Sequence, residues 1–212
     1  MAHNAGMSGP DYEFEKAARE RGAFVIAGAD EVGRGPLCGP VTAAAVVLDP
    51  GNLPDGLKDS KKLTEKKRLI LNDAILATAD CSIAHVSVEE IDQINILNAA
   101  MLAMERAVAG LTIAPDHILI DGNRIPKGLA QPAEAIVKGD ARSMSIAAAS
   151  IIAKVARDQI MADLAVEFPG YGWEKNAGYG TKQHMEALTR LGVTPHHRRS
   201  FKPVHNILYQ EK

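Results

Sequence analysis

The stretch AGADEVGRGPLCGP, residues 27–40, decides both the fold and the candidate site of this chain. It continues an apolar run, residues 23–30, whose β-branched residues predict a buried strand. Two adjacent carboxylates, Asp30 and Glu31, stand at the end of this predicted strand, and two glycines then flank an arginine. Neither feature assists folding. Together they predict a site where a cation and a phosphorylated ligand come close to the backbone.

The rest of the chain has a pattern of strands and helices that predicts an α/β protein. We expect further strands at residues 40–50, 81–88, 117–121 and 133–140. We expect helices at residues 65–79, 89–109, 143–168 and 181–192. Because strands follow one another directly at two places, the order predicts a mixed sheet flanked by helices rather than a strictly alternating parallel sheet.

Length and composition limit the class of protein. The 212 residues suffice for one domain, or for one domain with a smaller lobe. No run approaches the ~18 apolar residues of a membrane-spanning helix, and the polar N-terminus lacks a secretory h-region, so we expect a cytoplasmic protein. Residues 171–212 carry seven Lys or Arg against three acids, about +4, whereas the remainder carries 17 against 23, or −6. The basic C-terminal segment suggests an anionic partner, although a solvated helical surface would explain it equally well.

Acidic residues close three of the predicted strands: Asp30 with Glu31, then Asp121, then Asp140. Ends of neighbouring strands lie close together, so these carboxylates can converge and raise one another's pKa. Oxygen ligands of this kind suit Mg²⁺ or Mn²⁺, which points to phosphoryl chemistry. For any one of these positions an ordinary turn-forming residue is about as good an explanation, but four acids beside glycines favour a site.

The glycine-rich loop GRGPLCG, residues 33–39, fits a variant of the dinucleotide-binding fingerprint. That fingerprint must open a helix, and here Pro36 and Pro40 intervene before a predicted strand, so a Rossmann site is excluded. The loop instead offers exposed backbone groups, because glycine permits a close approach. We expect Arg34 to point at the bound group.

A polar and cationic stripe is predicted along the helix at residues 143–168. Its members fall within about 60° of one another on a helical wheel: Ser143, Ser150, Lys154 and Arg157. Such a stripe suits a phosphate backbone. An ion pair between Lys154 and Asp158 at i,i+4 would weaken this interpretation. His196 and His197 lack a third ligand at zinc-like spacing, and we expect them to be surface or phosphate-contacting groups.

Several segments, in this order along the chain, closely resemble one known family, type 2 ribonuclease H or ribonuclease HII. These segments are GADEVGRGPLCGPV, LKDSKKLTEKKR, ILIDGN, KGDARSMSIAAASIIAKVARD, NAGYGTKQH and GVTPHHRRSFKPV, which span residues 25–204. The resemblance implies a ribonuclease H-like fold. It divides the chain into an N-terminal arm (1–22), a catalytic domain (23–168) and a C-terminal helical substrate-binding lobe (169–212).

The resemblance also implies an activity: hydrolysis of the RNA strand of RNA–DNA hybrids, and incision 5′ of single ribonucleotides in duplex DNA. Two Mg²⁺ or Mn²⁺ ions would be held by the family's acidic tetrad, Asp30, Glu31, Asp121 and Asp140. The family's 2′-OH-sensing loop matches Gly33, Arg34 and Gly35, and its nucleotide-packing tyrosine matches Tyr179. Phosphate-contacting positions match Lys61, Ser150, Lys154 and Arg157. Products would carry 5′-phosphate and 3′-hydroxyl ends.

Two alternatives remain open. A nuclease of the same superfamily with another substrate would use a similar acidic cluster but would not need the Gly33–Gly35 loop or Tyr179. A non-catalytic hybrid-binding module would show no metal-dependent turnover. The tail NILYQEK has no evident sliding-clamp-binding motif, so a clamp partner is not supported. We also expect no membrane association and a monomer.

Overall fold

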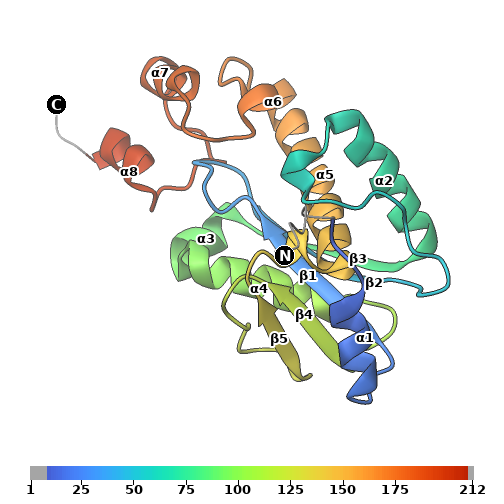
Figure 1. Cartoon of the computed structure of the whole chain (residues 1–212). Helices are drawn as coiled ribbons and strands as arrows, with labels where there is room; N and C mark the ends of the chain where they lie inside the picture. Colours follow the sequence, from blue (N-terminus) through green and yellow to red (C-terminus); the bar gives the residue numbers. More distant parts are fainter. Residues whose placement is uncertain (1–8, 210–212) are drawn as a thin grey trace, which may run out of the picture.

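A five-stranded mixed sheet lies at the centre of the computed structural model, which describes residues 9–209 (Figure 1). Residues 1–8 of the predicted arm and 210–212 of the tail lie outside the described part. The strands are β1 (Ile26–Val32), β2 (Val41–Val47), β3 (Asp80–Val86), β4 (His117–Asp121) and β5 (Ala133–Ile136). Their spatial order is β3-β2-β1-β4-β5, with β2 antiparallel to both of its neighbours, β1 and β3, and with β4 and β5 parallel to β1. The predicted mixed sheet is confirmed.

Helices cover both faces of this sheet. They are α1 (Glu13–Glu20), α2 (Glu65–Thr78), α3 (Val88–Ile94), α4 (Ile96–Ala109), α5 (Met144–Glu167), α6 (Trp173–Asn176), α7 (Lys182–Leu191) and α8 (Lys202–Tyr209), with 3₁₀ turns η1 (Ser60–Lys62) and η2 (Gly139–Ala141). The expected helix starts are confirmed for α2 and α5, where the side chains of Thr64 and Ser143 accept hydrogen bonds from backbone N–H groups. No helix among residues 9–209 is long and apolar enough to cross a membrane.

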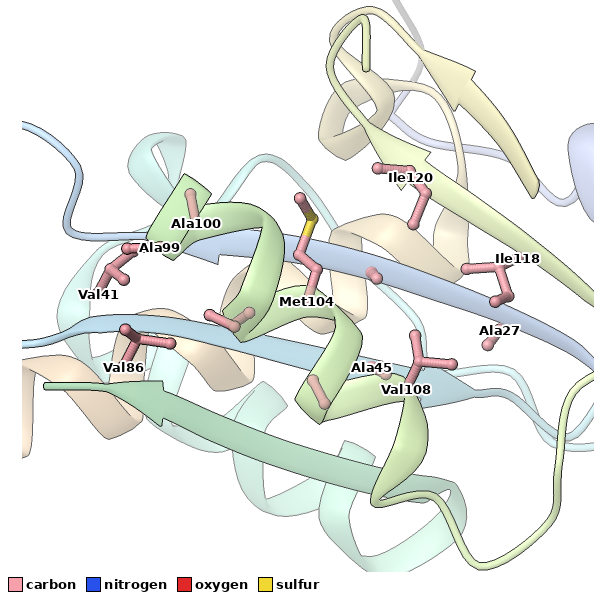
Figure 2. Packing of buried hydrophobic residues seen from close by; sticks show 14 of the residues in the cluster. Ala27, Val41, Ala45, Val86, Ala99, Ala100, Met104, Val108, Ile118 and Ile120 are labelled. Carbon is pink, nitrogen blue, oxygen red and sulfur yellow. The ribbon is translucent and has the colours of Figure 1, made fainter. Parts of the chain in front are cut away.

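Small side chains bring α4 close to one face of the sheet. Figure 2 shows Ala99, Ala100 and Met104 of α4 above Ala45 and Ile118 of the strands, all of them buried. On the opposite face, α2 and α5 pack against β2, and α1 contributes Ala18 beside β1 and β4. The glycine at position 28 lets the start of α5 approach β1, because a Cβ there would lie 2.2 Å from the Ser145 carbonyl carbon.

Most predicted elements differ from the observed ones by a few residues at their ends, and three of the differences change the local structure. The expected helix at 89–109 is two helices, because Asn95 adopts φ 66° and its side chain caps α4 by accepting from Leu97 N–H and Asn98 N–H. The expected strand at 133–140 ends at Ile136, where the chain turns into η2. The first strand runs on through Val32 rather than ending at Asp30, since β2 continues to pair with it up to Val32.

A separate, smaller core joins the C-terminal helices to the rest of the molecule. It combines residues of the glycine-rich loop and of α5 with residues of the C-terminal segment: Leu37, Cys38, Met161, Tyr171, Trp173, Ala187, Leu188 and Val204. In Figure 1 this segment, coloured orange and red, lies at the far end of α5 from α1. The glycine-rich loop therefore lies at the junction of the sheet and the C-terminal helices.

Candidate active site

Strand register brings Asp30 and Asp121 side by side. The parallel pairing of β1 with β4 matches Ala29 to Ile120, so Asp30 and Asp121 are the next residues in register. Neighbouring strands lie about 4.8 Å apart. Because side chains alternate along a strand, Asp30 and Glu31 leave opposite faces of the sheet, and Asp30 is buried on the side of α5. Asp121 ends β4, as expected.

Asp140 reaches the same region from a 3₁₀ turn and not from a strand end. The N–H of Gly139 donates to Asp121 Oδ1 at 2.7 Å, and the N–H of Asp140 approaches the same oxygen at 3.4 Å. These bonds tie the turn η2 to the end of β4. A Cβ at position 139 would lie 2.6 Å from the terminal methyl of Ile146, so glycine lets the turn pack closely against α5.

Electrostatic coupling shows that the acids form one group. Burial raises the pKa of Asp30 well above its usual value, and the charges of Glu31 and Asp121 raise it further, while the nearby Ser150 hydroxyl partly opposes this. Burial also raises the pKa of Glu31, against the opposing charge of Arg34. The pKa of Asp140 is raised by burial and then by Asp121.

Lys61 is the predicted phosphate-contacting residue that does lie next to the acids. Burial alone would lower the pKa of Lys61, but the charges of Asp30 and Asp140 raise it. Its position follows from η1, where the Asp59 carboxylate accepts from the Lys61 N–H at 3.0 Å. A cation at this edge of the acidic group is well placed to approach a bound phosphate.

The donor chemistry of the acidic group fits divalent cations that prefer oxygen ligands. Carboxylates that raise one another's pKa favour a bound cation, and Mg²⁺ and Mn²⁺ take such hard ligands. No three of these carboxylates have ligand oxygens that all lie within 4.8 Å of one another in the described chain. The spread fits carboxylates that share cations with a substrate better than a closed, all-protein cage.

The glycine-rich loop and Tyr179 meet beside the acids. A Cβ on Gly35 would lie 3.1 Å from the Tyr179 ring, so the ring lies against this glycine. Gly33 adopts φ 95°, and a Cβ there would lie 2.1 Å from Arg157 Nε. Both the turn and the close approach therefore require glycine at position 33. Arg34 donates to Glu31 Oε1 at 3.3 Å, which links the loop to the acidic group.

The structure corrects the prediction that Arg157 contacts phosphate. Arg157 is 1% exposed, and its guanidinium donates to the carbonyls of Pro40, Ala177 and Cys38 at 2.9–3.0 Å. A guanidinium with these three bonds holds the chain together and has no free face for a ligand.

The other members of the predicted stripe are also engaged within the protein. Ser150 is buried and hydrogen-bonds with the Ser60 hydroxyl at 3.0 Å, and Ser143 is buried as the cap of α5. Lys154 pairs with Asp158, as the alternative interpretation proposed. Of the four side chains, Lys154 alone keeps appreciable solvent exposure for a phosphate contact.

His197 is buried, contrary to the expected surface position, and it lies close to Cys38 and forms a hydrogen bond with His184. Ligand atoms of these three residues lie within 4.8 Å of one another. Thr194 N–H donates to His197 Nδ1, so the ring proton sits on Nε2 and is donated to His184 Nε2 at 3.1 Å. Burial raises the pKa of the Cys38 thiol to about 12. The ring nitrogens His197 Nδ1 and His184 Nε2 thus each accept a hydrogen bond from within the protein.

This histidine cluster has a clear structural role instead. His184 Nδ1 donates to the Tyr179 carbonyl at 2.9 Å, and Trp173 Nε1 donates to His184 Nε2 at 3.1 Å. The backbone of Tyr179 is thereby anchored to the C-terminal core. The sequence prediction missed His184 and Arg198 as site-supporting residues, although both lie in segments that carry the family resemblance.

Comparison with known proteins agrees with this geometry. The family model for ribonuclease HII matches residues 27–204. The ribonuclease HII of Ruegeria sp. strain TM1040 is 67% identical over 210 residues, which cover 99% of this chain and 92% of that protein.

Solved structures give the same relationship in three dimensions. The ribonuclease H2 of Pyrococcus horikoshii OT3 has a TM-score of 0.73 at 30% identity, covering 87% of this chain and 97% of that one. The Archaeoglobus fulgidus ribonuclease HII, solved in a complex with PCNA, has a TM-score of 0.72 at 27% identity, covering 84% and 96%. The fold is ribonuclease H-like, and the chain belongs to the ribonuclease HII family of metal-dependent endoribonucleases.

Proposed function

We propose that this endoribonuclease hydrolyses the RNA strand of RNA–DNA hybrids and also incises duplex DNA on the 5′ side of a single embedded ribonucleotide. The observation that carries the proposal is the juxtaposition of two features. Asp30, Asp121 and Asp140 form one coupled acidic group, and the Gly33–Gly35 loop with Tyr179 lies beside it. The first suits phosphodiester hydrolysis, and the second suits inspection of one sugar.

The acidic tetrad is proposed to hold two divalent cations, Mg²⁺ or Mn²⁺, together with the substrate phosphate. When bound, such a pair supplies Lewis-acid activation of the attacking water and stabilises the leaving 3′-oxygen during in-line displacement. Asp30 and Asp121, adjacent in register, are the central ligands of this assignment, and Glu31 and Asp140 flank them. Lys61 would contact the phosphate, and the products would carry 5′-phosphate and 3′-hydroxyl ends.

Recognition of the sugar is assigned to the loop and the tyrosine. Gly35 is exposed, and its lack of a side chain lets a ribose approach the backbone, where a larger residue would clash. The 2′-OH distinguishes RNA from DNA at one position. Tyr179, 48% exposed and lying against Gly35, would test the following sugar for the absence of that hydroxyl. An ion pair with Glu31 positions Arg34, which would approach the phosphate between the ribose and the following sugar.

The substrate range separates this proposal from its alternatives. The wild-type protein would be incubated with Mg²⁺ and two duplexes of identical sequence, one all-DNA and one with a single ribose. We expect a cut only in the ribose-containing duplex, at the phosphate 5′ of the ribose, and no cut without metal. Equal cutting of both duplexes would favour the general-nuclease alternative. Binding without any turnover would favour the hybrid-binding module.

We also propose that the chain divides into a catalytic part and a substrate-binding part. We assign catalysis to residues 23–168 and duplex contacts to the helical segment 169–212, whose charge favours an anionic partner. A monomer suffices for this assignment, because the acids, the loop and Tyr179 all come from one chain. The tail of this chain offers no evident clamp-binding motif, so no clamp partner is included.

A further inference from the structure

Arg198 is a buried arginine that binds the glycine-rich loop and has no part in the chemistry described above. It is 0% exposed. Its Nη2 donates to the Gly33 carbonyl at 2.6 Å and to the Gly39 carbonyl at 2.9 Å, and Nε also donates to Gly39 at 3.0 Å. Its Nη1 donates to the carbonyls of Arg34 at 3.1 Å and Pro36 at 2.8 Å. One side chain therefore binds four carbonyls of one loop.

Together with Arg157, this side chain determines which way the loop backbone faces. The backbone N–H of Arg198 donates to Leu37, and Arg157 binds the carbonyls of Cys38 and Pro40. From residue 33 to residue 40, every carbonyl except that of Gly35 thus accepts a bond from one of the two arginines. In the described part of the chain, the N–H groups of Arg34 and Gly35 donate to no protein acceptor. These two residues are also exposed, whereas Gly33 and residues 36–39 are buried.

We propose that Arg198 is a positioning residue for ribonucleotide recognition: it turns the loop carbonyls inward and so presents the N–H groups of Arg34 and Gly35 to the substrate sugar and phosphate. The inference rests on the proposed function, because it assumes that this loop meets the ribose. Successive outward-facing N–H groups favour an anionic or lone-pair-bearing ligand. The carbonyls that would repel such a ligand are held away from it by Arg198.

The environment of Arg198 fits this role better than that of an ordinary ion pair. In residues 9–209 no carboxylate forms a salt bridge with it, so carbonyl dipoles of the loop are its main compensation. Its guanidinium lies 5.0 Å from the Phe201 ring centroid. The residues on both sides of Arg198 in the sequence are held in place. His197, before it, is hydrogen-bonded to His184 and Thr194, and the N–H groups of Arg199 and Ser200, after it, donate to Asp92 of α3. The side chain therefore approaches the loop from a fixed backbone.

Arginine is needed at this position because of its geometry and not only because of its charge. A guanidinium offers five N–H donors in a planar fork, whereas an ammonium offers three from a single atom. Arg198→Lys keeps the charge but cannot reach four carbonyls spread over seven residues of loop. The matched control is Arg19→Lys, the same change at an exposed arginine of α1, outside the segment to which duplex contacts are assigned.

The decisive measurement is the single-turnover rate on the single-ribose duplex, with enzyme in saturating excess and with Mg²⁺. Loss of folded protein alone lowers the active concentration but leaves this rate constant unchanged. We expect Arg198→Lys to lower it on the order of 100-fold, because a loop displaced by about 1 Å loses alignment. Arg19→Lys should retain the wild-type rate. A wild-type rate for folded Arg198→Lys would overturn the proposal. If that variant does not fold, Arg198→Gln, which avoids burying a compact charge, is judged by the same criterion.

A second measurement does not depend on activity, and so separates this proposal from the proposed function. Trypsin can cut between Arg34 and Gly35 when the loop leaves its inward-facing conformation. We expect Arg198→Lys to speed this cut relative to cutting after the exposed Lys182, whereas global unfolding would speed both. An unchanged ratio overturns the proposed role of Arg198. If the wild type cuts both duplexes equally, the proposed function fails, and the tryptic ratio still decides whether Arg198 sets the loop.

Discussion

The buried histidine cluster makes stability depend on pH in a way that can be calculated. Burial, together with a smaller effect of the neighbouring His184, lowers the pKa of His197 from 6.5 to about 4. Between these values the unfolded chain binds a proton that the folded chain does not. The free energy of unfolding therefore falls as the pH falls from 6.5 towards 4, and His197 contributes no pH dependence above 6.5. At about 1.4 kcal/mol per pH unit, the loss is roughly 3 kcal/mol.

This prediction is tested by comparing the wild type with His197→Gln, because other groups titrate in the same range. Burial raises the pKa values of Asp30, Glu31 and Asp140, so these acids favour the folded state on acidification in both proteins. The difference between the two pH profiles isolates the cluster. His184, whose pKa is also lowered by burial, adds a loss in the same direction when His197 is present.

The assay is urea unfolding without metal at a series of pH values from 7 to 4. Trp173 is the only tryptophan, is 1% exposed and donates to His184, so its fluorescence reports on the cluster directly. We expect the wild type to lose roughly 3 kcal/mol more than His197→Gln across this range. Parallel profiles would refute the argument that His197 is held neutral in the folded protein.

Three further predictions concern the site. Asp121→Asn should abolish turnover while hybrid binding persists. It should also raise the metal-free melting temperature slightly, because it relieves like-charge repulsion. A lower melting temperature would contradict a clustered acidic site. Arg157→Ala should destabilise the fold by about 3 kcal/mol or more, and it should leave the salt dependence of hybrid affinity unchanged. Lys154→Ala, in contrast, should flatten the slope of log K against log salt by about one counterion. Tyr179→Ala should sharply reduce incision at a lone ribonucleotide with little change in stability, since the ring is half exposed; undiminished incision would remove Tyr179 from recognition.

The candidate acidic site was predictable because Asp30 and Asp121 each directly follow an apolar run that reads as a strand, and the ends of neighbouring strands lie close together. An apolar run that ends in acids places them at one edge of a sheet, and parallel pairing of β1 with β4 then aligns Asp30 with Asp121. The position of Asp140 was less predictable. The chain leaves β5 at Ile136 and returns through η2, a turn fixed by the bonds from Gly139 and Asp140 to Asp121. Those bonds exist only in the folded sheet.

The predicted phosphate stripe is largely buried, for a physical reason. A helical wheel gives the direction of a side chain but not what covers it, and the C-terminal segment covers α5 at Arg157. The same segment buries His197, which by sequence alone resembles a surface histidine in a basic run. The break between α3 and α4 was missed because both halves share one helical pattern. Asn95 ends the first half and caps the second, a local choice that periodicity does not detect.

The loop between β1 and β2 links the two halves of the proposed enzyme. Its first residues follow directly from Asp30 and Glu31, and its later residues, Leu37 and Cys38, belong to the C-terminal core. A displacement of the C-terminal helices would therefore reach the carboxylates through a single short loop held by two arginines. Such an arrangement couples recognition of the sugar to the position of the acids, because neither the loop nor Tyr179 can shift without changing bonds made by Arg198, Arg157 or His184. If the loop recognises the ribose as proposed, selectivity depends on the buried side chains of Arg198 and Arg157 as well as on Tyr179.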